Sequence, residues 1–176
     1  MTRTSSILRL VVVLLASASL MVGSVGVTSA NATQSSYVPT AEECQFLGLI
    51  NDYRAQNGIG PLALSVTLGD AARNHSAQIA ATDFFSHTLP DGTSWADNIR
   101  NYGYTYNTWI GENLAAGNYE PSYALLQWQR SAPHNANMLA PEFKAIGIGM
   151  VYEPNSSWGY YWTTTFGGYV DQTVSC

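Results

Sequence analysis

Two strand-like runs near the carboxyl end most constrain what this chain can fold into. Residues 145–152 and 159–166 are rich in Gly, Ile, Tyr and Thr, and the segment Glu-Pro-Asn-Ser-Ser-Trp joins them. Two such runs separated by turn-forming residues predict an antiparallel hairpin. The segments before them have helical patterns, and helices followed by a hairpin predict an α+β fold.

The helical patterns have recognisable ends. Residues 41–57 carry apolar side chains at helical spacing, Thr40 can cap their start, and Gly58 can end them. A second helix is predicted from Ser65 or Thr67 to about residue 81. Two shorter helices are predicted over residues 94–103 and 121–130, the latter with a proline at its first position.

Residues 1–32 have the pattern of a secretory signal peptide. Arg3 and Arg9 are the only charged side chains there, an apolar run covers residues 8–20, and Ala-Asn-Ala closes the segment. The run is short for a membrane span, and no second one follows it. We therefore expect a secreted protein with a signal peptide at 1–32, an N-terminal tail at 33–42, one domain at 43–176, and no membrane span in the mature chain.

Charge excludes one class of partner. Without Arg3 and Arg9, five lysine and arginine residues stand against twelve aspartate and glutamate residues, a net charge of −7. A basic surface for nucleic acid is therefore not expected. The acidic residues are dispersed along the chain and form no acidic tail.

The two cysteines, Cys44 and Cys176, lie near the two ends of the predicted domain. In an exported protein an even pair of cysteines usually forms a disulfide, which here would close nearly the whole domain. A metal-binding pair is the alternative, but neither cysteine has a Cys or His neighbour in the sequence.

The stretch Ile-Gly-Glu-Asn-Leu-Ala-Ala-Gly at residues 110–117 places one acidic side chain in apolar surroundings. A buried carboxylate is costly unless a cation or hydrogen-bond donors meet it. His87 and His134 flank Glu112 at similar distances along the chain, and we expect the fold to bring the three together at the floor of a surface cleft. The alternative is that both histidines only brace loops.

Two other polar side chains have to be interpreted separately. His75 lies on the apolar face of a predicted helix, where a half-buried structural histidine is the simpler interpretation. Ser131 precedes His134 by three residues, and Ser with His and Glu suggests a hydrolase triad. However, no Gly-x-Ser-x-Gly turn accompanies it.

Seven segments together resemble one protein family. They are residues 49–58 (LINDYRAQNG), 71–76 (AARNHS), 85–87 (FSH), 111–115 (GENLA), 128–139 (WQRSAPHNANML), 146–149 (IGIG) and 161–167 (YWTTTFG). In this order they resemble the bacterial members of the CAP superfamily of SCP-like extracellular proteins. That superfamily includes cysteine-rich secretory proteins, insect venom antigens (antigen five) and plant pathogenesis-related proteins.

The resemblance implies an α-β-α sandwich with an antiparallel central sheet and a large open cavity. In the family the cavity often presents two His and two Glu, which can hold a divalent metal such as zinc. By motif, three of these positions are His87, Glu112 and His134, which are the expected metal ligands. The fourth position, a glutamate in the family, is Ser131 here, and this departure removes one carboxylate.

We therefore expect a secreted binding domain whose His/Glu-lined cleft holds a divalent metal and a small ligand. The resemblance suggests sterols or other lipids as the ligand class, and an envelope component is another candidate partner. Catalysis is not expected. One alternative is a metal-assisted or His-Glu hydrolase of peptides or cell-wall polymers, with Glu112 as the base. Another is a structural envelope protein; a monomer is expected in each case.

Overall fold

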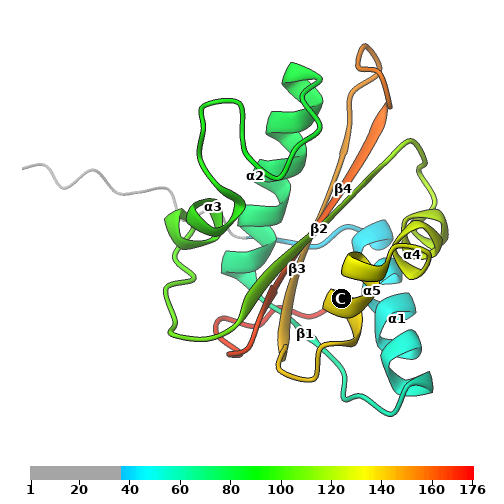
Figure 1. Ribbon diagram of the computed structural model, residues 1–176, viewed down its shortest axis with the longest axis vertical. Helices are drawn as coiled ribbons and strands as arrows, with labels where there is room; N and C mark the ends of the chain where they lie inside the picture. Colours follow the sequence, from blue (N-terminus) through cyan, green and yellow to red (C-terminus); the bar gives the residue numbers. More distant parts are fainter. Residues whose placement is uncertain (1–36) are drawn as a thin grey trace, which may run out of the picture. The chain divides into compact units, whose positions relative to one another are not determined.

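The computed structural model describes residues 37–176 (Figure 1); the predicted signal peptide and residues 33–36 of the predicted tail lie outside this range. The helices are α1 (Ala41–Gln56), α2 (Val66–Thr82), α3 (Trp95–Asn101), α4 (Pro121–Gln129) and α5 (Ala132–Leu139). The strands are β1 (Ala63–Leu64), β2 (Ile110–Ala116), β3 (Ala145–Tyr152) and β4 (Tyr160–Gly167). None of these helices is long and apolar enough to span a bilayer.

The four strands form one sheet in the order β1-β3-β4-β2. The predicted hairpin is confirmed, since β3 and β4 pair antiparallel from Ala145 opposite Gly167 to Tyr152 opposite Tyr160. Strand β2 also pairs antiparallel with β4, and this places Glu112 opposite Thr165. The two-residue strand β1 is the exception to the expected antiparallel sheet, because it runs parallel to β3.

Helices cover both faces of the sheet, which confirms the expected α-β-α sandwich (Figure 1). Helices α2 and α3 lie on one face, and α1, α4 and α5 lie on the other. On the second face the ring of Phe46 stacks on Trp128, with centroids 5.0 Å apart, and meets Trp162 edge-on at 5.1 Å. All three rings are buried and form the centre of the larger core.

Helix α2 approaches the sheet closely because β3 carries glycines beneath it. A Cβ atom on Gly147 would lie 2.0 Å from the carbonyl carbon of Leu68, and one on Gly149 would lie 2.4 Å from the backbone nitrogen of Arg73. The Oγ1 of Thr165 also donates to the Leu68 carbonyl oxygen at 2.8 Å. The backbone of α2 therefore contacts the sheet directly, and this sets the distance between the side chains of α2 and strand β2.

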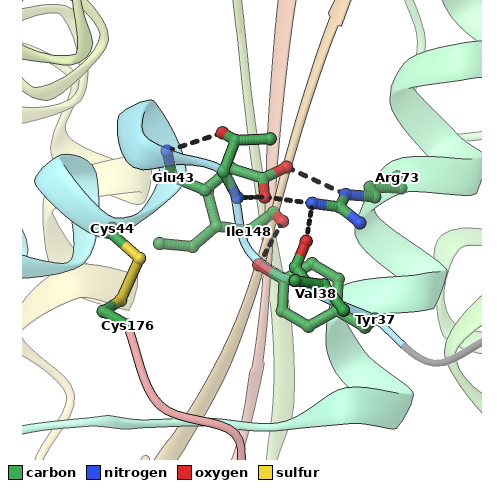
Figure 2. The surroundings of a disulfide bond; sticks show 8 residues. Tyr37, Val38, Glu43, Cys44, Arg73, Ile148 and Cys176 are labelled. Carbon is green, nitrogen blue, oxygen red and sulfur yellow. Dashed lines mark hydrogen bonds and ion pairs between the residues drawn. A yellow bond between two sulfur atoms is a disulfide. The ribbon is translucent and has the colours of Figure 1, made fainter.

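The start of α1 is fastened to the domain by a buried carboxylate (Figure 2). Thr40 and Glu43 form a capping box, and Glu43 also accepts from Arg73 Nε at 3.0 Å and from the backbone N–H of Met150 at 3.1 Å. Tyr37 is buried and donates to the carbonyl of Ile148 at 2.8 Å. The described end of the predicted tail is thus packed against the domain.

The predicted disulfide is confirmed. Cys44 and Cys176 are bonded, with their Cα atoms 5.5 Å apart, beside the Glu43 contacts (Figure 2). The bond joins the first turn of α1 to the last residue and encloses a sequence separation of 132 residues.

Candidate functional site

Glu112 lies on β2 with its side chain almost fully buried, and both of its carboxylate oxygens face imidazoles. Oε1 lies 2.7 Å from Nδ1 of His87, and Oε2 lies 2.7 Å from Nδ1 of His75. His75 belongs to α2, whereas His87 belongs to the segment that follows it. Two cation-forming side chains therefore offset the cost of burying this carboxylate.

His75 is the fully buried partner of Glu112. Its Nε2 lies 2.9 Å from the carbonyl oxygen of Ser86, which can only accept, so Nε2 carries a proton. Its Nδ1 faces the carboxylate at ion-pair distance but without hydrogen-bond alignment. Since both ring nitrogens face acceptors, we assign His75 as an imidazolium. Burial lowers its pKa, but the contacts with Glu112 and Ser86 raise it more, so the pKa lies above the ordinary 6.5.

This pair makes stability depend on pH. The folded pKa of His75 is higher than the unfolded one, so its contribution is complete below about pH 6.5 and is lost as the pH rises through the folded pKa. We expect the urea midpoint of the wild type to fall as the pH is raised above about 6.5, and His75→Gln to flatten this slope. Burial, and then the charge of His87, lower the pKa of His134. The titration of His134 therefore changes the stability only below about pH 6.5. Equal slopes in both proteins would contradict the charge assignment.

His87 and His134 form the accessible part of the cluster. The side chain of His87 is 51% exposed, and because its Nδ1 donates to Glu112, its Nε2 is the nitrogen with the free lone pair in the neutral ring. The ring of His134, in the first turn of α5, has its centroid 6.4 Å from that of His87 and also 6.4 Å from that of Trp128. The two imidazoles therefore face one another across an opening.

Two asparagines hold α5 against β2 and so position His134. The Nδ2 of Asn113 donates to the backbone carbonyl of His134 at 2.9 Å. The Nδ2 of Asn137 donates both to Asn113 Oδ1 at 2.9 Å and to the carbonyl of Glu112 at 3.1 Å. The side chain of Asn113, the residue after Glu112 on β2, therefore helps to fix the position of His134.

Two adjoining cavities meet at His134. One, of about 400 Å³, has a mostly apolar lining, and the other, of about 350 Å³, is lined by His87, Glu112 and Asn137 with neighbouring residues. Residues of β2 line both, so the cavities form one cleft along this strand, which we call the β2 cleft. The residues of its apolar half are Phe85, Leu114, Ala115, Ala116, Gln127, Trp128, Ser131, His134 and Trp158.

The structure brings His87, Glu112 and His134 into one cluster, as the sequence suggested. Ser131 lines the apolar half of the cleft, and its side chain does not cap α5, although it stands at the start of that helix. The sequence interpretation missed His75, which was assigned a half-buried structural role but is fully buried and pairs with Glu112. No local signal marks His75 as this partner, because helical periodicity accounts equally well for a structural histidine.

The cluster does not fit the expected three-ligand metal centre. Both oxygens of Glu112 already meet imidazole nitrogens. Two imidazoles on one tetrahedral zinc have ring centres about 5 Å apart, whereas those of His87 and His134 are 6.4 Å apart. Within residues 37–176 no three His, Cys, Asp or Glu side chains are arranged to hold a metal ion. Zinc held by His87, His134 and Glu112 therefore remains a prediction that requires the cluster to rearrange.

Comparison with solved structures supports the fold. An extracellular protein from Bacillus anthracis that contains an SCP domain is 26% identical, with a TM-score of 0.63 over 75% of this chain and 45% of that one. An outer surface protein from Borrelia burgdorferi is 19% identical and has the same fold, with a TM-score of 0.65 over 79% of this chain and 99% of that one.

Sequence comparison gives relatives in Bacillus subtilis. YkwD is 33% identical over 141 residues, which are 80% of this chain and 51% of that protein. The membrane protein YlbC is 26% identical over 113 residues, 64% of this chain and 32% of that protein. The chain therefore spans about half of the first relative and a third of the second. The family model for CAP, the cysteine-rich secretory protein family, matches residues 47–166. This chain belongs to the CAP family.

Proposed function

We propose that this domain is an extracellular binding protein that holds a small amphiphilic molecule in the β2 cleft. The observation that carries the proposal is the junction at His134 of an apolar cavity with a polar one. Ligand sites are typically concave, mostly apolar, and supplied with a few converging polar groups, at volumes of about 300–1,000 Å³. The rings of Trp128 and Trp158 would contact the apolar chain of the molecule, and the polar groups that line the cleft along β2 would meet its polar end.

Binding is favoured over hydrolysis because the cluster lacks a nucleophile. A serine hydrolase requires a hydroxyl within hydrogen-bond reach of its base. Among the described residues, neither His87 nor His134 has a hydroxyl as a side-chain hydrogen-bond partner. Ser86, beside His87, instead accepts from the backbone N–H of Thr88 at 3.0 Å. The free Nε2 of His87 suits a ligand acceptor when protonated and a ligand donor when neutral.

Two exposed tryptophans provide a matched test. Trp158 is 56% exposed and lines the apolar half of the cleft, whereas Trp109 is 70% exposed and lines a different cavity. Nile red, a neutral apolar dye, should bind saturably to the wild type with a rise in fluorescence. Trp158→Ser should weaken binding at least tenfold, because contact with an indole ring contributes about 1.5 kcal/mol or more.

Trp109→Ser should bind Nile red like the wild type. Both variants change exposed side chains and should keep the wild-type circular dichroism spectrum and melting temperature, so a difference between them reports on the cleft. Failure of the dye to saturate on the wild type, or equal weakening by the two substitutions, would reject the proposal.

A further inference from the structure

Strand β2 forms an edge of the sheet, so half of its backbone groups are not used by the ladder. Just beyond its ends, the N–H of Gly117 donates to the Tyr160 carbonyl at 2.9 Å, and the N–H of Gly168 donates to the Trp109 carbonyl at 3.0 Å. Hydrogen-bonded pairs alternate along an antiparallel ladder. The odd-numbered residues of β2 therefore bond to β4, while Glu112, Leu114 and Ala116 turn both N–H and C=O away from it.

The outward carbonyls of these three residues accept hydrogen bonds from side chains, whereas their outward N–H groups have no acceptor among the described residues. Each of the three carbonyls accepts from a side chain: Glu112 from Asn137 Nδ2 at 3.1 Å, Leu114 from Trp128 Nε1 at 2.8 Å, and Ala116 from Gln127 Nε2 at 3.3 Å. Within residues 37–176, the N–H groups of the same three residues have no hydrogen-bond partner. Between Glu112 and Ala116 the open edge of β2 thus offers three N–H donors, while each of its three outward carbonyls already accepts one hydrogen bond.

This edge belongs to the β2 cleft. Leu114 and Ala116 line its apolar half together with Gln127 and Trp128, and Glu112 lines its polar half together with Asn137. The side chains that occupy the carbonyls are therefore walls of the same cleft. An unpartnered N–H in a mostly buried place costs about 1–3 kcal/mol, and an acceptor placed there would recover that loss.

We infer that the polar group of the ligand is an uncharged carbonyl, as in an acyl ester, which accepts from the N–H groups of β2. This rests on the proposed function and specifies its ligand. A group that must donate finds each of these three carbonyls already accepting a hydrogen bond from a side chain. A neutral group suits the site because Glu112 and His75 already offset one another, and because the acidic residues of the chain outnumber its basic ones, twelve to seven, which disfavours an anion.

Three probes with the same apolar chain test the chemistry by competition with Nile red. Methyl dodecanoate only accepts and is neutral, dodecanoate only accepts and is anionic, and dodecylammonium only donates. We expect the ester to bind best and the amine about tenfold more weakly or worse. The amine should bind more weakly than the ester even though its charge is opposite to the net charge of the protein.

Two substitutions test the edge itself. Proline is tolerated on an edge strand where its missing N–H faces outward, so Ala116→Pro should keep the melting temperature within a few degrees and weaken the ester about tenfold. Ala115→Pro removes a ladder N–H instead and should lower the melting temperature. Gln127→Ala frees the Ala116 carbonyl, so the amine should bind more tightly and should gain affinity relative to the ester.

The outcomes separate the two proposals. If no probe displaces Nile red because the dye does not bind, the proposed function fails, and this inference fails with it. If the dye depends on Trp158 but ester and amine compete equally, the inference alone is overturned. An unfolded Ala116→Pro protein leaves the probe series and Gln127→Ala to decide, and an amine that does not gain from Gln127→Ala contradicts the inference.

Discussion

Gly147→Ala should lower the free energy of unfolding by about 3 kcal/mol or more, the upper end of the cost of overpacking a core. A Cβ at this position would lie 2.0 Å from the Leu68 carbonyl carbon and 2.3 Å from the Gly69 nitrogen. These are backbone atoms of α2, so relief requires the whole helix to move off the sheet. Because α2 carries His75, the same displacement should separate His75 from Glu112. Urea denaturation and the melting temperature, expected to fall by about 10 °C, measure the effect.

Gly48 provides the matched control. It lies inside α1, and a Cβ there would meet no atom within 4 Å. Gly48→Ala should therefore stabilise the domain by about 0.5–1 kcal/mol, because alanine loses less backbone freedom in a helix than glycine does. Similar effects of the two substitutions would show that α2 is not seated on β3 as described.

Cys176→Ser should cause the second large loss. In the chain-entropy account, opening a loop of this length costs about 5 kcal/mol, and measured values are often smaller. The sequence separation of 132 residues places nearly all of the described chain inside the loop. The loss should raise the entropy of the unfolded chain and release the carboxyl-terminal residues from α1.

Hydrogen exchange and urea denaturation distinguish these two effects. The segment after β4 should exchange faster in Cys176→Ser, while amides of β3 and β4 stay protected until global unfolding. Reduction of the wild type should give the same pattern, and Cys44→Ser serves as the second variant. An unchanged urea midpoint after complete reduction would contradict the expected role of the bond.

The sequence predicted the elements whose signals are local. Thr40 caps α1 as expected, α3 lies within the range 94–103 where a short helix was predicted, and the turn composition of residues 153–158 located the hairpin. The meeting of His87, Glu112 and His134 could be predicted because a buried carboxylate requires partners and because the motifs resembled a known family. Distances along the chain carried no information about that meeting, since the three residues come from a loop, a strand and a helix.

The parts that the sequence did not predict depend on tertiary contacts. Strand β2 contains Gly, Asn and Ala, which are poor strand formers, and it is extended because β4 and side chains of α4 and α5 pair with its two edges. Helix α5 has only eight residues, too few for its period to be visible. His75 looked like part of an apolar face, and only the packing of α2 on the glycines of β3 brings it to Glu112.

The bond between Cys44 and Cys176 also governs how the domain responds to tension. A pulling force applied between the segment before Cys44 and Cys176 passes across one sulfur–sulfur bond, with the two Cα atoms 5.5 Å apart. The sheet and the helices, apart from the first turn of α1, lie outside that load path. When the domain is held at one end and pulled at the other, the force is therefore transmitted through covalent bonds. The β2 cleft then keeps its shape under load.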